Sequence, residues 1–199
     1  MPARRHIGAI GLLAVGLLTA VLPATPSSAA VIKATAYGVW AQGALSAGPL
    51  PHADSAAGPT SARGGPWVLG KPYMQILSAQ EFHVAAQRQS TSLWADAQVK
   101  GILAFGRTIE VENLSASCAS TGTGIRAEVR MGRNHFGNSV AGEGVIPAPE
   151  RITFDGGSAV VNEQQVRASD GTLTVNALHI TMNSGPSFVL GSVTCTRLA

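Results

Sequence analysis

Two glutamates separated by a single residue are this chain's candidates for acid–base chemistry. Glu110 and Glu112 belong to RTIEVENLSASCAS (107–120), where apolar and polar residues alternate, so in a β-strand both side chains would lie on one face. Glycoside hydrolases place two carboxyl groups ~5–9.5 Å apart across a substrate cleft. Neighbouring charges on the solvent side of a strand account for the same spacing. The pair is therefore a candidate glycan site, with an ordinary charged surface as the alternative.

The other polar residues do not form a recognisable catalytic or metal-binding set. The histidines after residue 30 lack metal-ligand spacing; they are His52, His83, His135 and His179. His179 could act as a base or ligand, and a hydrogen bond to a backbone carbonyl is the simpler use. Segment 137–141, GNSVA, partly matches a nucleophile elbow, but GEGVIPAP follows where that motif needs a helix. We therefore predict no catalytic residue, no metal site and no cofactor.

A polar pair and three tryptophans are candidates for ligand binding. Asn162 and Glu163, in VVNEQ, could hydrogen-bond a turn or bind a polar ligand. Trp40, Trp67 and Trp94 could stack on sugar rings, although two of them stand in predicted strands, where core packing is the default.

The first thirty residues indicate the compartment in which the mature protein functions. Two arginines precede an apolar run over 7–21, and small residues follow it, with Ser28 and Ala30 at the −3 and −1 positions of a signal peptide. The run is shorter than the ~20 residues of a membrane anchor. We predict cleavage after Ala30, with Ala29 as the alternative, and a single secreted domain over 31–199.

Charge and cysteine content narrow the class of protein further. Without its first thirty residues the chain has twelve basic and eleven acidic residues and lacks a basic stripe with aromatics, which argues against nucleic-acid binding. Charged residues make up only 13% of the chain, which suits β-strands with Ser, Thr and Asn on their solvent faces better than helices. An even, small cysteine count in an exported chain predicts a disulfide between Cys118 and Cys195, with two free thiols as the alternative.

The pattern of short alternating segments predicts an all-β fold, an antiparallel β-sandwich or flattened barrel of about 8–11 short strands. Segment 78–89 fits a strand or a helix, and the strand is favoured. The alternation changes phase near Glu112 or Asn113 and again within 171–182, which indicates a β-bulge in each. Segment 43–66 holds four prolines and five glycines, and we predict that it is a long flexible loop.

The stretch GSAVVNEQQVRASDGTLTVNALHITM…FVLGSVTCTR (157–197) resembles the choice-of-anchor P family of secreted actinobacterial proteins. In that family a strand ending VLNEQ, a VNALHI strand and a final GSATC-type strand recur in this order. ILAFGRTIEVENLSASCAS (102–120) and ATAYGVWAQG (34–43) are similar to the family's earlier strands, so the resemblance covers most of 34–197. It implies that Cys118 and Cys195 are the matched pair, and it assigns no catalytic residue.

These observations predict a secreted, non-catalytic β domain of the cell envelope or medium with a structural or interaction role. Its partner is not identified by sequence; a cell-wall component or another envelope protein would fit. The alternative is a carbohydrate-binding or glycan-modifying protein that uses an exposed tryptophan together with Glu110 and Glu112.

Overall fold

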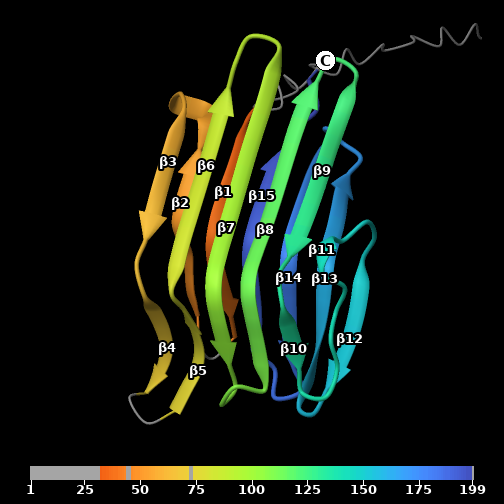
Figure 1. Ribbon diagram of the computed structural model, residues 1–199. Helices are drawn as coiled ribbons and strands as arrows, with labels where there is room; N and C mark the ends of the chain where they lie inside the picture. The colour runs from red at the N-terminus through yellow and green to blue at the C-terminus, as the bar shows by residue number, and fades with distance from the viewer. Residues whose placement is uncertain (1–31, 44–45, 72–73, 199) are drawn as a thin grey trace, which may run out of the picture.

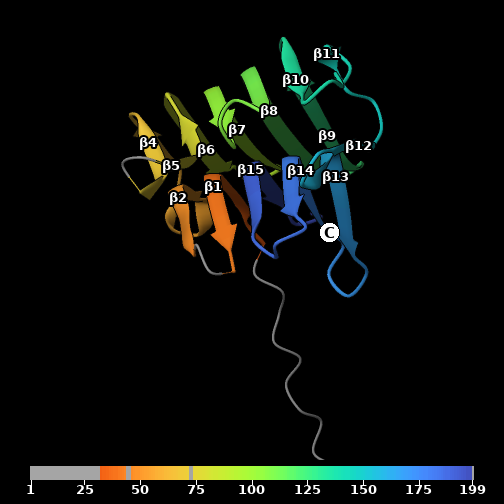
Figure 2. The ribbon, with the colours of Figure 1, turned by 90° about the horizontal axis from the view of Figure 1, so that it is seen from below.

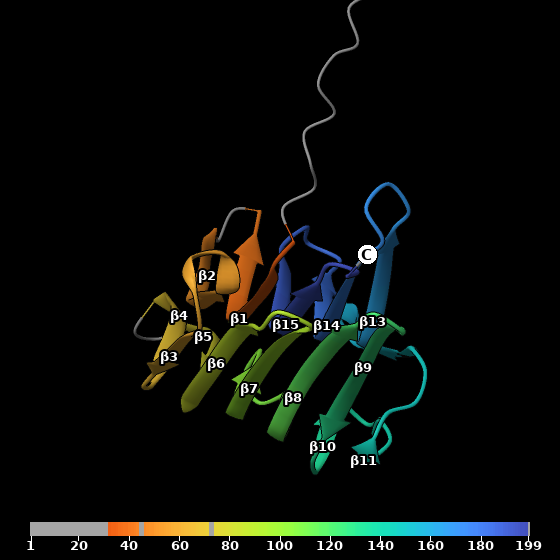
Figure 3. The same cartoon turned by 90° about the horizontal axis from the view of Figure 1, so that it is seen from above.

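The computed structural model describes residues 32–43, 46–71 and 74–198, which form two antiparallel sheets packed face to face. Both sheets are open at their edges and do not close into a barrel, as views along the strands show (Figure 2 and Figure 3). The structure thus confirms the predicted β-sandwich. The predicted signal peptide and its cleavage site at Ala30 lie outside the described residues.

Six strands form one layer, which lies behind the other in Figure 1, in the order β12-β13-β14-β15-β1-β2. Their bounds are β1 (Ala34–Gln42), β2 (Ala47–Asp54), β12 (Glu150–Phe154), β13 (Gly157–Arg167), β14 (Thr172–Met182) and β15 (Ser187–Cys195). The first strand and the last, β1 and β15, pair antiparallel in the interior of this sheet.

Nine strands form the other layer, with the long strands β7 and β8 at its centre. Their bounds are β3 (Thr60–Gly64), β4 (Trp67–Lys71), β5 (Met74–Ala79), β6 (Glu81–Arg88), β7 (Ser92–Ala104), β8 (Ile109–Thr121), β9 (Gly124–Met131), β10 (Asn134–Phe136) and β11 (Gly144–Val145). β5 and β6 lie end to end along β7, and β9 and β10 lie end to end along β8. Each of these two lines of pairing is interrupted and so counts as two strands. This helps to explain why the described residues form fifteen strands, whereas the sequence predicted 8–11.

The core lies between the layers, where β1 and β15 pack against β6, β7 and β8. Many of its inward-facing residues are alanine or valine, and the phenyl rings of Phe82, Phe136 and Phe188 are the largest fully buried side chains. Cys118 on β8 and Cys195 on β15 form a disulfide inside this core, which confirms the predicted bridge.

The prediction of a flexible loop over 43–66 is wrong for most of that range. β2 and β3 lie within it, joined by the short 3₁₀ turn η1 (Ser55–Ala57). β2 is one of the two edge strands of its sheet, and among the described strands β3 pairs with β6 alone. Edge strands tolerate proline because one side of the backbone needs no partner. The serine hydroxyl of Ser55 also accepts a buried hydrogen bond of 2.8 Å from the backbone N–H of Ala34 on β1, which anchors the turn.

The structure contains both of the changes in apolar alternation that the sequence shows. The prediction that each is a β-bulge is wrong, because neither strand has an extra residue relative to its partner. On β8 the buried parity changes between Val111 and Leu114, yet the register with β7 is the same on both sides, because Lys100 pairs with Asn113 and Ile102 with Val111. On the neighbouring strands the set of alternate residues that is buried also changes, at the same height along the sheet, so no strand needs an extra residue. The positions of this change form a line across the strands, which we call the crease of the nine-stranded sheet. It passes through Gln80, Gly101, Glu112 and Arg133.

A matching crease crosses the six-stranded sheet through Asn162, Ala177, Gly191 and Gly38. Left-handed backbone at Asn162 (φ 56°) and Gly191 (φ 62°) accommodates the change of face, as Gly101 (φ 62°) does in the other sheet. The creases decide which side chains reach the two outer surfaces, because strand residues three apart then face the same way.

Candidate functional site

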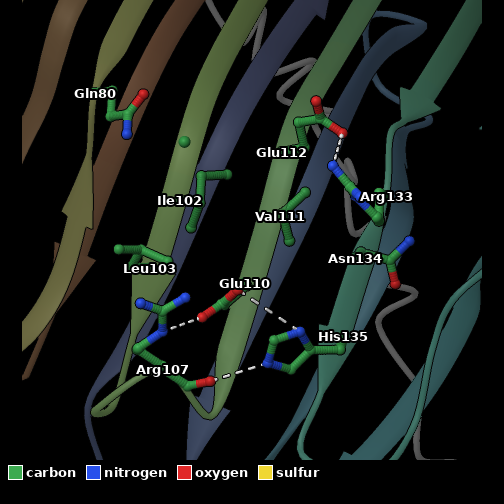
Figure 4. Close-up of a pocket in the computed structure, with 11 residues that line it drawn as sticks. Gln80, Ile102, Leu103, Arg107, Glu110, Val111, Glu112, Arg133, Asn134 and His135 are labelled. Carbon is green, nitrogen blue, oxygen red and sulfur yellow. Dashed lines mark hydrogen bonds and ion pairs between the residues drawn. The ribbon is translucent and has the colours of Figure 1, made fainter.

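A groove of about 540 Å³ crosses the outer face of the nine-stranded sheet at its crease. Figure 4 shows its polar side chains, which come from β8, from the β7–β8 turn, from the link between β5 and β6, and from β10 and the link that precedes it. We call it the charged groove, and its ionic residues are Arg107, Glu110, Glu112, Arg133 and His135.

Glu110 is the better shielded of the two groove carboxylates. The Arg107 Nε donates to Glu110 Oε1 at 2.5 Å, and His135 Nδ1 lies 3.9 Å from Glu110 Oε2 (Figure 4). His135 Nε2 is 3.0 Å from the carbonyl oxygen of Arg107, which holds the imidazole against the turn. Arg107 has left-handed backbone (φ 72°), which is uncommon for a residue other than glycine and fixes the direction of its side chain.

Glu112 has a different partner, because its carboxylate lies 3.6 Å from the guanidinium of Arg133. The two glutamates share the outer face of β8, as the alternation predicted, but their side chains turn toward separate arginines (Figure 4). They do not face each other across a substrate cleft as a glycosidase pair does. The groove therefore presents alternating positive and negative groups, an arrangement suited to binding a polar surface.

A second polar cluster occupies the outer face of the six-stranded sheet. Glu163, Asn176, Ser192 and Tyr37 stand directly opposite one another on β13, β14, β15 and β1, and we call them the polar row. Asn176 Nδ2 donates to Glu163 Oε2 at 2.7 Å, and Ser192 Oγ donates to Asn176 Oδ1 at 2.7 Å. Burial raises the pKa of Tyr37, a hydrogen bond with Ser192 lowers it, and the charge of Glu163 raises it; the net effect is upward. The phenol therefore stays protonated.

The polar row continues into His179, whose Nδ1 lies 3.0 Å from Glu163 Oε2. The simpler use predicted for His179, a bond to a backbone carbonyl, is thus wrong, because the crease turns it toward a carboxylate. Asn162, by contrast, has the structural use: its Nδ2 donates to the carbonyl of Ile146 at 2.8 Å, and its left-handed φ lies on the crease.

The three tryptophans lie in three separate places. Trp40 is 37% exposed on the outer face of the six-stranded sheet, and its ring lies nearly perpendicular to that of Tyr37 with centroids 6.1 Å apart. Trp94 is 41% exposed on the other sheet, seven residues along β7 from the crease, a distance of about 23 Å. Trp67 packs against Phe82 at the edge of the core. A site that combines an exposed tryptophan with Glu110 and Glu112 is therefore not formed.

The remaining candidates lie on several different elements. His52 is exposed on β2, directly opposite Tyr37, and His83 lies on β6. Segment 137–141 forms a turn closed by backbone hydrogen bonds between Phe136 and Ser139, with no helix after it. Within the described ranges, no three His, Cys, Asp or Glu side chains converge as metal ligands. No helix among these residues is long and apolar enough to cross a membrane.

Sequence reasoning missed the arginine partners and most of the polar row. Arg133 meets Glu112 only through the pairing of β8 with the β9–β10 line, and Tyr37 meets Ser192 through the pairing of the first strand with the last. The changes of phase near residues 112 and 177 were the one sequence signal that marked both places.

Comparisons with models of protein families, with curated proteins and with solved structures found no significant match to this chain.

Proposed function

We propose that this chain is an exported, non-catalytic interaction domain of the cell envelope or medium, with the charged groove as its docking surface for a polar partner. The observation that supports it best is the separate pairing of Glu110 with Arg107 and of Glu112 with Arg133. Each carboxylate has a cationic neighbour and neither confronts the other, so the groove lacks a convergent acid–base pair. The resemblance of 157–197 to the choice-of-anchor P family supports the same class of protein.

The chemistry of the groove favours a partner that carries both charges or many hydrogen-bonding groups. Exposed ion pairs contribute only ~0–1 kcal/mol to stability, so a partner can exchange its own groups for them at little cost. Arg107, Arg133 and Glu112 are exposed enough to be reached, with side-chain exposures of 73%, 80% and 54%. A cell-wall component or another envelope protein fits this description.

The export step is tested by expressing the full chain in a host with a secretory pathway and sequencing the N-terminus of the product in the medium. We expect the secreted chain to begin at Val31. A product that stays in the cells with its first residues intact would contradict export.

The docking surface is tested with the secreted chain, its Arg107→Ala/Arg133→Ala variant and the control Arg126→Ala, which alters an exposed arginine on β9. We expect no turnover of peptide, ester or glycoside substrates. We also expect salt-sensitive binding to purified insoluble cell wall, lost in the double variant and kept in the control. Turnover abolished by Glu110→Gln would overturn the non-catalytic role. Binding that the double variant retains in full, or no binding at all, would overturn the groove as docking surface.

A further inference from the structure

We propose that the outer face of the six-stranded sheet carries a second site, which binds a neutral β-linked pyranose chain. In this site Trp40 supports the face of one sugar ring, and the pair formed by Glu163 and His179 hydrogen-bonds the hydroxyls of a neighbouring ring. The site goes beyond the proposed function, because it lies on the opposite face of the sandwich from the charged groove.

The crease is what assembles this site. Trp40 and Tyr37 are three residues apart on β1, and on a regular strand they would face opposite sides of the sheet. Because the buried parity changes at Gly38, both rings face outward and meet edge to face. His179 and Asn176 are related in the same way on β14, and both contact Glu163.

The spacing of the side chains suits a ligand of more than one ring. Trp40 pairs with Val189, and Val189 pairs with His179, so the indole and the imidazole are two strands apart in one row. That separation is about 10 Å. A small single-ring molecule does not span it, whereas two or more linked sugar rings do.

The polar groups are held ready for a ligand rather than left mobile. Ser192 is fully buried although it points to the outer side of the sheet, and its hydrogen bond fixes Asn176, which in turn fixes Glu163 Oε2. His179 uses Nδ1 on the same oxygen, so Nε2 is left to bond a ligand. Glu163 Oε1 and His179 Nε2 have no hydrogen-bond partner among the described residues, and neither atom is completely buried. Both atoms therefore face solvent.

The combination of groups selects the class of ligand. The exposed part of the Trp40 indole offers apolar contact to the C–H groups of a sugar ring, and a carboxylate with an imidazole offers an acceptor and a second polar atom to its hydroxyls. The carboxylate disfavours an acidic polymer. A sheet face is flat, and β-1,4-linked pyranoses with equatorial substituents have the flat faces that match it.

The experiment titrates the secreted chain with cellohexaose, chitohexaose and xylohexaose, following tryptophan fluorescence and calorimetry, with polygalacturonate as the acidic comparison. We expect at least one neutral probe to bind with a shift in emission. Trp40→Ala and Glu163→Gln should each weaken that binding at least tenfold. The matched control Trp94→Ala, which removes the other exposed tryptophan, should leave binding unchanged.

Trp40→Phe guards against a folding defect, because it keeps an aromatic ring beside Tyr37; we expect it to retain part of the affinity. Arg107→Ala/Arg133→Ala should bind the sugar normally, which separates this site from the charged groove. The proposal is overturned if no neutral probe binds or if only polygalacturonate binds. It is also overturned if Trp94→Ala weakens binding as much as Trp40→Ala does.

Discussion

Cys118, near the end of β8, and Cys195, the last residue of β15, join the two sheets inside the core, with their Cα atoms 6.2 Å apart. Cys118 stands between Ala95 and Ala127 on the neighbouring strands, and Cys195 stands between Ala34 and Leu173. The bridge therefore attaches the last strand to the centre of the opposite sheet.

Removing this bridge should be among the most damaging changes to the fold. The cysteines are 77 residues apart in sequence, and closing a loop of that length contributes about 4 kcal/mol in the chain-entropy model. We expect Cys118→Ala/Cys195→Ala to lose about 2–5 kcal/mol in the free energy of unfolding, measured with urea. In the wild type, alkylation before reduction should label no cysteine. Two labelled thiols in unreduced native protein would contradict the bridge.

Ser55 should matter to stability although it lies in a segment rich in glycine and proline. Its hydroxyl accepts the backbone N–H of Ala34 in a buried position, and Ser55→Ala leaves that N–H without a partner. We expect a loss of about 1–3 kcal/mol in the free energy of unfolding. Ser61→Ala, at an exposed position on β3, is the control and should change little. Equal effects of the two substitutions would show that β2 and η1 are not anchored as described.

The contrast between Ser55 and its sequence context shows what sequence reasoning could and could not reach. The all-β class, the sandwich and the disulfide follow from alternation, low charge and an even cysteine count. The edge strands β2 and β3 could not be predicted, because edge pairing needs few apolar residues and tolerates proline. The partners of Glu112 and Tyr37 could not be predicted either, because those contacts depend on which strands pair and in what register. A single sequence does not specify the register.

Gly191 should be intolerant of any side chain, because the crease places it in left-handed backbone inside the core. A Cβ there would lie 3.3 Å from the Cβ of Ala177 on β14. Gly106 has a similar φ of 64° but open space around it, so it provides the matched control. We expect Gly106→Ala to cost about 1–2 kcal/mol from backbone strain and Gly191→Ala to cost clearly more, measured by thermal and urea unfolding. Equal costs would contradict close packing at the crease.

Asp96 should make stability depend on pH in the acid range. Burial raises the pKa of this carboxyl, although a hydrogen bond from Gln98 and the charge of His83 oppose the rise. The folded chain therefore holds the proton more tightly than the unfolded chain. By linkage, this group's contribution to the free energy of unfolding falls as pH rises from about 4, its ordinary range, through the raised value, and stays lower at neutral pH.

Asp96→Asn removes the ionisable carboxyl, and its side-chain oxygen still accepts the bond that Gln98 Nε2 donates at 3.0 Å. We expect the variant to be more stable than the wild type at pH 7, and we expect the gain to disappear below about pH 4, where the wild-type carboxyl is protonated in both states. Urea unfolding at a series of pH values measures this difference. Asp155→Asn, at an exposed turn, reports the effect of removing one negative charge alone. If Asp96→Asn gave the same pH profile as Asp155→Asn, or were less stable than the wild type at pH 7, burial of the Asp96 carboxylate would not be a cost to this fold.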